Sequence, residues 1–550
     1  MTHTHLTLDD VSYLLPDGRV LFSHLNMRFH AQRIGLVGRN GVGKTVLARL
    51  LAGELRPSAG RCLRGGTAHY LAQRAGAPRG DTAAGLAGLQ APLDALARIE
   101  AGSVDARDYE LLGDRWDLRQ SLEREWRRFG LGHLRPETPA DALSGGEAAR
   151  AALCGAILSD ADFLILDEPS NHLDRNQRQA LIEQLSLWPR GLLVISHDRR
   201  LLAGMERIVE LSPQGLASYG GAYDFYAEHK AQEQARVLQT LEQRKQERLR
   251  GQRALREQQE RQERRQARGE RRGREANQAS ILLDRQQQRS EDSAGKLRRQ
   301  QAAAREGLDQ AVREAARRAE GDAAVVVHAL PQGRALRRTA IVLDEVELPF
   351  APPATRRIGL SLGGGRRIGV LGPNGCGKST LLKVLAGQLR PVAGRVRSPA
   401  ACAYLAQDLD GLDPGRGAIE QLLALNPAAG ESRLRMLLAQ LGLDAERAAR
   451  PCGLLSGGER LKAALACALY ADPPPQWLLL DEPSNHLDLP SLQALEAMLR
   501  GYHGGLLVVS HDEGFLDALG LDGWLTVDEG GWRLLDGAER EKRVINQAWF

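Results

Sequence analysis

Several features that mark particular classes of protein are scarce or absent in this sequence. Six cysteines are scattered over 550 residues without a C-x-x-C pair, which argues against a zinc or iron–sulfur module and suits a reducing compartment. No run of about 18 apolar residues occurs, so the sequence predicts no membrane span. The first residues hold neither a basic nor an apolar segment, so we expect no signal peptide. These absences together predict a cytoplasmic protein.

Aromatic residues are also scarce, at 4% of the chain, and they are unevenly spread. Residues 227–320 contain no aromatic residue and no proline, and Glu, Gln, Arg and Ala dominate. This composition predicts a long helix exposed to solvent or to a polar partner. The segment holds about 24 Arg and Lys against about 16 Asp and Glu, whereas the rest of the chain is slightly acidic. Such an asymmetry points to a nucleic-acid partner.

A phosphate-binding loop, G-x-x-x-x-G-K-[ST], occurs twice. Each copy follows an apolar run and precedes a helical pattern, which is the strand–turn–helix context of this motif. Its backbone N–H groups bind phosphate oxygens, its lysine reaches the terminal phosphates, and its last hydroxyl binds Mg²⁺. The predicted residues are Gly38, Asn40, Gly41, Gly43, Lys44 and Thr45 in the first copy, and Gly372, Asn374, Gly375, Gly377, Lys378, Ser379 and Thr380 in the second.

The motifs that follow these loops are duplicated as well. LSGGE occurs at 143–147 and 455–459, and each copy begins a helix rich in Ala and Leu. Apolar runs at 163–166 and 477–480 end in Asp-Glu-Pro-Ser-Asn-His-Leu-Asp, and later apolar runs end in Ser-His-Asp. Carboxylates at the ends of buried parallel strands lie where α/β sheets bind ligands. The spacing between paired motifs indicates about 22 extra residues in the first copy, near 85–133.

The order of the duplicated motifs resembles that of the ATP-binding cassette ATPases. In each copy a phosphate loop is followed by a glutamine loop (Gln73 or Gln407), LSGGE, an Asp-Glu pair at the end of a strand, NHLD and a later histidine. The chain resembles the ABC-F subfamily in three further features: two cassettes in one chain, NHLD after the Glu, and a charged linker. The studied members of this subfamily mostly bind ribosomes. We therefore expect an α/β protein with two P-loop cassettes, 1–222 and 331–550, in tandem. A charged α-helical hairpin, 223–330, would join them.

The resemblance implies ATP and Mg²⁺ as cofactors, in two sites between cassettes that pair head to tail within a monomer. Glu168 and Glu482 would polarise the attacking water, and His197 and His511 would sense the γ-phosphate. Because both sites keep these groups, we expect both to hydrolyse ATP. The implied Mg²⁺ residues are Thr45, Asp167, Ser379 and Asp481. The other implied nucleotide-binding residues are Gln73, Ser144, Gly145, Gly146, Gln407, Ser456, Gly457 and Gly458.

The family often stacks an aromatic residue on adenine, some distance before the phosphate loop. Phe350 lies at the implied distance in the second copy, whereas the same offset in the first copy falls on Pro16, close to Tyr13. Phe350 is therefore a candidate for adenine binding. Ordinary core packing is the alternative for both Phe350 and Tyr13.

In the linker we expect two antiparallel helices with a tip near 270–293, and we expect Gly269, Gly273 and the stretch 277–280 to interrupt the first helix. The expected tip carries the arginines Arg268, Arg271, Arg272, Arg274, Arg285 and Arg289. Guanidinium groups of this kind bind phosphates or stack on bases. The resemblance implies contact with ribosomal RNA and the P-site transfer RNA. A solvated spacer is the alternative.

The function we expect is ATP hydrolysis coupled to ribosome binding and to a change in translation. Three rivals share parts of this pattern. One is the ATPase subunit of a transporter, which would need a membrane partner. Another is a regulatory module in which ATP controls contact with a protein. The third is a DNA-repair ATPase, for which the expected zinc-binding cysteines are missing.

Overall fold

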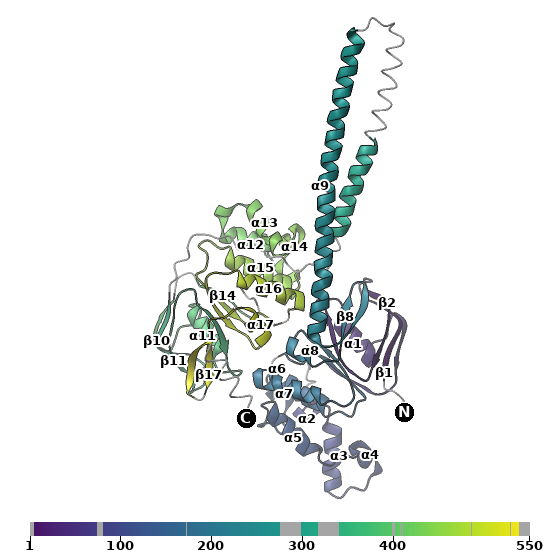
Figure 1. Ribbon diagram of the computed structural model, residues 1–550. Coiled ribbons are helices and arrows are strands. Elements are labelled where there is room, and N and C mark those ends of the chain that lie inside the picture. Colours follow the sequence, from purple (N-terminus) through teal and green to yellow (C-terminus); the bar gives the residue numbers. More distant parts are fainter. Residues whose placement is uncertain are drawn as a thin grey trace. The chain divides into compact units, whose positions relative to one another are not determined.

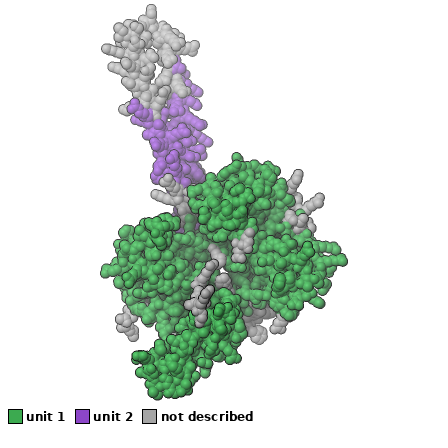
Figure 2. All heavy atoms as spheres, turned by 180° about the vertical axis from the view of Figure 1, so that it is seen from behind, with its two compact units in different colours: residues 1–225, 325–550 green, residues 226–324 purple. Residues whose placement is uncertain are grey.

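The computed structural model forms two compact units, residues 1–225 with 325–550 and residues 226–324 (Figure 2). The residues described are 5–73, 81–171, 173–275, 299–316, 340–398, 402–407, 409, 411–485, 487–528 and 530–537, without the side chains of 262, 263, 265, 266 and 269–275. Within these residues no helix combines the length and the apolar character needed to cross a membrane.

A six-stranded sheet lies at the centre of the first cassette (Figure 1). Its strands are β3 (Arg33–Gly38), β5 (Ala68–Leu71), β6 (Phe163–Asp167), β7 (Gly191–Ile195), β8 (Arg207–Ser212) and β9 (Gly215–Gly220). The strand order is β5-β6-β7-β3-β8-β9, and β9 alone runs antiparallel to its neighbour. Every residue of β6 and β7 is buried, as expected for short apolar runs at the centre of a parallel sheet.

A smaller antiparallel sheet, ordered β2-β1-β4, lies beside the central sheet. Its strands are β1 (His5–Leu14), β2 (Val20–His30) and β4 (Ala59–Arg64). The first helix, α1 (Lys44–Ala52), shares one hydrophobic core with both sheets, in which Leu8, Leu47 and Ile165 are fully buried or nearly so. Burying these side chains fixes α1, and with it the phosphate loop, against the central strands.

The other helices of the first cassette carry its LSGGE motif, called the signature from here on, and its extra residues. They are α2 (Ala83–Leu86), α3 (Gln90–Glu100), α4 (Ala106–Leu112), α5 (Leu118–Arg128), η1 (Ala140–Ala142), α6 (Gly145–Ile157), α7 (Arg175–Ser186) and α8 (Arg199–Ala203). Among the described residues, four α-helices lie between Gln73 and the LSGGE motif of the first cassette, whereas three lie between Gln407 and the LSGGE motif of the second. The additional turns of helix account for part of the greater length of the first copy.

The second cassette repeats this architecture strand for strand. Its central strands are β12 (Arg367–Leu371), β14 (Cys402–Leu405), β15 (Trp477–Asp481), β16 (Gly505–Val509), β17 (Gly523–Asp528) and β18 (Gly531–Asp536), in the order β14-β15-β16-β12-β17-β18. Its antiparallel strands are β10 (Ile341–Glu347), β11 (Arg357–Leu362) and β13 (Ala393–Arg397). Its helices are α11 (Lys378–Leu385), α12 (Ala418–Leu425), η2 (Pro427–Ala429), α13 (Glu431–Gln440), α14 (Ala445–Ala449), η3 (Cys452–Leu454), α15 (Gly457–Leu469), α16 (Leu489–Arg500) and α17 (Glu513–Ala518). The predicted fold of two tandem α/β cassettes is confirmed.

The linker is a hairpin built from α9 (Tyr223–Glu275) and a second helix, 299–316 (Figure 1). Gln259 Nε2 donates to Gln301 Oε1 at 3.2 Å, and Arg248 lies 3.7 Å from Asp309. Because residue numbers rise on one helix as they fall on the other, the two helices are antiparallel, as predicted.

The expected interruption of the linker at Gly269 and Gly273 is wrong, since α9 continues through both to Glu275. An isolated helical glycine costs only about 1 kcal/mol, and the flanking Arg, Glu and Gln residues are good helix formers. Most of the predicted tip, with Arg285 and Arg289, lies outside the described residues.

We predict that Gly505→Ala lowers the thermal unfolding midpoint. A Cβ at Gly505 would lie 2.4 Å from a ring carbon of Trp477, its fully buried partner on β15. Overpacking of this kind costs about 1–3 kcal/mol. Gly220→Ala is the control, because a Cβ there meets no atom within 4 Å. Circular dichroism melting curves test this, and an unchanged midpoint for Gly505→Ala would show that Trp477 can move aside.

Candidate nucleotide-binding sites

The two phosphate loops have the same backbone geometry. Gly43 and Gly377 precede α1 and α11 with φ of 104° and 100°, a left-handed conformation that favours glycine. Each helix begins at the loop lysine, so free N–H groups of the first turn face the loop. Lys44 Nζ donates to the carbonyl oxygens of Gly38 and Arg39, at 2.7 and 3.1 Å. These contacts fold the buried lysine back over its own loop.

Lys378 repeats this arrangement, with its Nζ donating to the carbonyl oxygens of Gly372 and Pro373 at 2.8 and 2.9 Å. Gly38 has a structural role of its own, because a Cβ there would lie 2.3 Å from the carbonyl oxygen of Leu211. A side chain at Gly38 would therefore push the loop away from β8.

Each loop hydroxyl meets the aspartate at the end of a central strand. Thr45 Oγ1 donates to Asp167 Oδ2 at 2.7 Å, and Ser379 is hydrogen-bonded to Asp481. Burial raises the pKa of both carboxyls, and these hydroxyls oppose that rise. Hydroxyl and carboxylate oxygens are the ligands that Mg²⁺ prefers, so each pair fits a magnesium ion.

Two tyrosines that the motif analysis did not single out support these aspartates. The hydroxyls of Tyr70 and Tyr404 donate to Asp167 and Asp481, each at 3.2 Å. Both tyrosines occur three residues before the glutamine of the glutamine loop, at the end of β5 or β14. That repeated spacing is the signal by which the sequence could have revealed them.

The glutamates next to these aspartates hold an unusual backbone conformation. Glu168 and Glu482 have φ of 51° and 49°, a strained region for a residue with a side chain and one often found at functional sites. Their N–H groups donate to the carbonyl oxygens of Ile195 and Val509, at 2.8 and 2.9 Å. These hydrogen bonds hold each glutamate at the carboxyl end of the central sheet.

Each glutamate lies beside the histidine of the next strand. His197 Nε2 is 3.5 Å from Glu168 Oε1, and His511 Nε2 is 3.4 Å from Glu482 Oε1. Burial raises the pKa of Glu482 to about 7 and lowers the pKa of His511 to about 3. The pKa values of Glu168 and His197 shift in the same directions for the same cause. The imidazoles are therefore neutral at pH 7.

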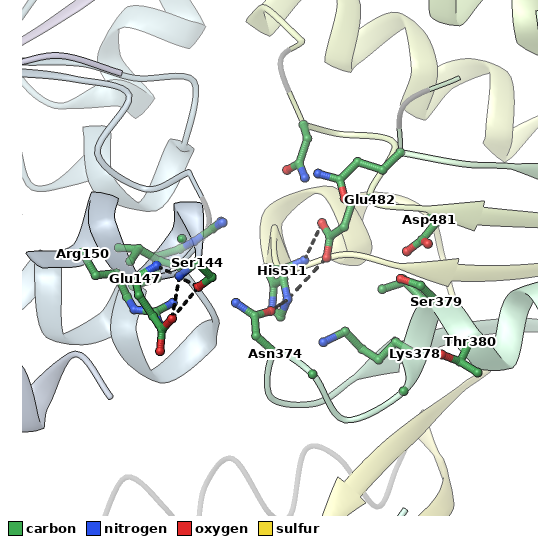
Figure 3. Close-up of a pocket in the computed structure, with 18 of the residues that line it drawn as sticks. Ser144, Glu147, Arg150, Asn374, Lys378, Ser379, Thr380, Asp481, Glu482 and His511 are labelled. Atoms are coloured by element: carbon green, nitrogen blue, oxygen red, sulfur yellow. Dashed lines mark hydrogen bonds and ion pairs between the residues drawn. The ribbon is translucent and has the colours of Figure 1, made fainter. Parts of the chain in front are cut away.

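The second site is a cavity of about 640 Å³. One side is formed by the second cassette, with Glu482, His511 and Asn374, while Ser144 and Glu147 of the first cassette lie opposite (Figure 3). The predicted residues that line it are Ser144, Gly146, Phe350, Asn374, Gly375, Gly377, Lys378, Ser379, Thr380, Gln407, Asp481, Glu482 and His511. Gly145 and Gly372 are not among the lining residues.

The first site is a cavity of about 540 Å³. The predicted residues that line it are Asn40, Gly41, Gly43, Lys44, Thr45, Gln73, Asp167, Glu168, His197 and Gly457. Gly38, Ser456 and Gly458 are not among the lining residues. The backbone N–H of Asn40 donates to Asp488 Oδ2 of the second cassette at 2.9 Å, so the phosphate loop of one cassette contacts the NHLD motif of the other.

The signature serines cap the helices that they begin. Ser144 Oγ accepts from the N–H of Glu147, and the Glu147 carboxylate accepts from the backbone N–H of Ser144 at 2.9 Å, which completes a capping box at the start of α6. Ser456 and Glu459 repeat this at α15. The N-terminus of each 13-residue helix favours an anion. The two glutamates, which prediction did not assign a role, thus fix the orientation of each signature.

Phe350 and Tyr13 differ in their surroundings and in whether they line a cavity. Phe350 is 91% exposed, adopts a left-handed φ of 60° and lines the second cavity, so core packing does not account for it. Tyr13 packs against Phe22, with ring centroids 6.3 Å apart, and does not line the first cavity. Leu15 and Leu21 line that cavity instead. An aromatic platform is therefore available at one site and aliphatic side chains at the other.

Comparison with known proteins agrees with this geometry. The ABC transporter family model matches residues 23–171 and 355–485. The chain is 30% identical over 532 residues to the energy-dependent translational throttle protein EttA of Mycobacterium tuberculosis, covering 91% of this chain and 87% of that protein. It is 31% identical over 557 residues to human ATP-binding cassette sub-family F member 3, covering 94% and 70%. The chain belongs to the ABC-F subfamily of ATP-binding cassette ATPases.

A solved structure shares the fold of this ABC-F protein at lower sequence similarity. RNase-L Inhibitor superposes with a TM-score of 0.58 at 18% identity, covering 98% of this chain and 93% of that one. At this identity the likeness concerns the fold, the tandem arrangement of two α/β cassettes.

We predict that Phe350→Ala weakens binding of an ATP analogue at the second site. Stacking of a base on an aromatic ring contributes about 1–3 kcal/mol, which is about 5- to 150-fold in affinity. Both side chains carry a Cβ, so the strain at φ 60° is unchanged. Titration in a Lys44→Ala background isolates the second site.

Tyr13→Ala is the contrasting variant, because it should lower thermal stability and leave the affinity of the second site unchanged. If Phe350→Ala and the parent protein bound the ATP analogue with equal affinity, Phe350 would not be an adenine-binding residue.

Proposed function

We propose that this ABC-F protein binds Mg²⁺ and ATP at both sites and hydrolyses the ATP. One observation carries the proposal. Each cavity places a phosphate loop, an Asp-Glu pair and a histidine from one cassette in a space also lined by the signature region of the other. Because residues of both cassettes line each of these two cavities, occupation of the sites would favour the paired state of the cassettes.

In the proposed hydrolysis each residue of the second site has a separate role, which agrees with its surroundings. Lys378 and the N-terminus of α11 would bind the phosphates, and Ser379 with Asp481 would hold Mg²⁺, which neutralises developing charge on the phosphate oxygens. Glu482 would orient the attacking water and accept its proton. His511, neutral and 3.1 Å from Asn374 Oδ1, would donate to the terminal phosphate. Thr45, Asp167, Glu168 and His197 would act likewise at the first site.

We further propose that the ATP-bound protein binds the ribosome through the linker hairpin and modulates translation in the cytoplasm. The described part of α9 exposes a series of arginines, Arg253, Arg256, Arg264 and Arg268. Exposed guanidinium groups on a long helix fit an RNA backbone. The name of the relative EttA, a translational throttle protein, supports the same partner, and the intramolecular pairing of two cassettes supports a monomer.

The test is co-sedimentation of Glu168→Gln, Glu482→Gln protein with ribosomes, in ATP or ADP. Loss of both carboxylates should trap ATP and the paired cassettes, so pelleting should be strong in ATP and weak in ADP. Absence of pelleting in both nucleotides would overturn the ribosome proposal and direct the search to a protein partner.

Linker charge can be tested with matched variants of the same trapped protein. Changing Arg253, Arg256, Arg264 and Arg268 to Gln should weaken pelleting and reduce its dependence on salt. Changing four exposed arginines of the antiparallel sheets to Gln, namely Arg28, Arg61, Arg395 and Arg397, removes equal charge and should have a smaller effect. An equal loss of pelleting in the two variants would indicate a general effect of charge.

We predict that kcat/KM for ATP rises with pH to a plateau, with an apparent pKa near 7. Burial raises the pKa of Glu482 to about 7 and raises that of Glu168, and each glutamate must be ionised to accept a proton. Below this pKa the ionised fraction falls about tenfold per pH unit. Steady-state kinetics between about pH 5.5 and 8.5 test this, and a flat profile would contradict it.

A further inference from the structure

Three ion pairs between the two cassettes have the same polarity. Arg175 and Arg200 of the first cassette both contact Glu513 of the second, and Arg175 Nε lies 2.5 Å from Glu513 Oε1. Arg199 Nη2 lies 2.9 Å from Glu496 Oε1. In these pairs the first cassette supplies the cations, from α7 and α8, and the second supplies the anions, from α16 and α17.

The two glutamates of these ion pairs are buried, and each side chain is only 5% exposed. Arg500, on the same helix as Glu496, also lies near that carboxylate, but at 3.9 Å and with a side chain that is 57% exposed. Arg199 of the other cassette is therefore the close partner. An association that buried these carboxylates without a cation would be strongly unfavourable.

The duplicated positions in the two cassettes do not carry the same charges. Motifs in the second half, such as Glu482 for Glu168, lie 314 residues after their counterparts. This offset pairs Arg175 with Leu489, Ile182 with Glu496, Arg199 with Glu513, and Arg200 with Gly514. The equivalent surfaces of the two copies thus differ in sign, positive in the first cassette and negative in the second.

The two cassettes meet with approximate twofold symmetry, since each cavity combines the phosphate loop of one with the signature region of the other. The same symmetry relates contacts at the charged surface. A Cβ at Gly514 would lie 3.8 Å from Arg199 Cδ, so Arg199 faces Gly514 as Arg200 faces Glu513. This symmetry determines which residues a pair of identical cassettes would bring together.

A pair of identical cassettes would place like charges in contact. Two copies of the first cassette would put Arg199 of one copy against Arg175 and Arg200 of the other. Two copies of the second cassette would put Glu513 against Glu496. Like charges in direct contact across an interface are strongly unfavourable, so the association of unlike cassettes is the one that these side chains favour.

Two aspartates near this surface do not distinguish the possible pairs. Asp512 interacts electrostatically with Arg199 across the interface. Its counterpart in the first cassette, Asp198, is also an aspartate. Either cassette would therefore offer an aspartate at this place, and the choice of partner depends on the glutamates.

We propose that the arginine face (Arg175, Arg199 and Arg200) and the acidic face (Glu496 and Glu513) select the partner of each cassette. Their opposite charges make the first cassette bind the second and disfavour its binding to another copy of itself. The inference rests on the proposed pairing of the cassettes around ATP. Specificity here comes from repulsion in the alternative pairs as well as from attraction in the native one.

The test is sedimentation velocity of Glu168→Gln, Glu482→Gln protein over a range of ATP concentrations, because this method reports compactness and mass together. The parent protein should stay a single chain and become compact as ATP is added. Arg175→Leu, Arg199→Glu and Arg200→Gly together give the first cassette the residues that the second has at these positions. The ATP concentration for half-maximal compaction should then rise at least about tenfold, since two bound ATP molecules would have to offset the lost contacts.

Charge exchange within one ion pair separates recognition from folding. Arg199→Glu and Glu496→Arg, each made alone, put like charges in contact and should each raise the ATP concentration for half-maximal compaction. The two substitutions together restore an ion pair of reversed polarity. The double variant should return to within about threefold of the parent protein, which a loss of folding could not produce.

Arg28→Glu with Arg107→Glu is the matched control for the triple variant. Both arginines are exposed residues of the first cassette, and their reversal changes the net charge by the same amount. This control should compact at the ATP concentration of the parent protein. Circular dichroism melting curves of all variants establish that each is folded.

Each other outcome has a definite meaning. An unchanged transition in the triple variant, an equal rise in the control, or a double variant no better than the single ones overturns the inference. A parent protein that forms dimers of chains as ATP is added also overturns it. If the compactness of the parent protein does not respond to ATP at all, the proposed ATP-dependent pairing is itself wrong, and the inference fails with it.

Discussion

The pairing of the two cassettes is the constraint on which both candidate sites depend. Each cassette supplies a phosphate loop, a carboxylate pair and a histidine from one end of its central sheet. The other cassette supplies the start of its signature helix and its NHLD segment. The hydrogen bond from Asn40 to Asp488 joins these segments directly. A ligand that occupies such a cavity stabilises the paired state because the separated state lacks half of the contacts.

Burial at the carboxyl ends of β6 and β15 gives this arrangement its chemistry. Glu168 and Glu482 are held there in a strained backbone conformation, at the cost of local stability that the surrounding strands compensate. The same burial raises the pKa of the glutamates and lowers the pKa of the histidines beside them. Each site thus places a carboxylate with a raised pKa beside a neutral imidazole, a pair that suits the proposed activation of water.

The two halves share a fold but are not equivalent. Phe350 adds to the second cavity an exposed aromatic ring that the first cavity lacks. In the first copy Tyr13 packs against Phe22 instead, and the aliphatic side chains of Leu15 and Leu21 line the cavity.

The sequence by itself determined the two cassettes, their strand–loop–helix order and the helical hairpin, because these depend on local motifs and on hydrophobic periodicity that are both repeated. It wrongly predicted that Gly269 and Gly273 interrupt α9, since the local propensity of a glycine is weak against a long run of helix formers. Tertiary structure alone decided which segments of the two cassettes meet, such as the backbone N–H of Asn40 with the Asp488 carboxylate. Such contacts join residues far apart in the chain, so no spacing in the sequence encodes them.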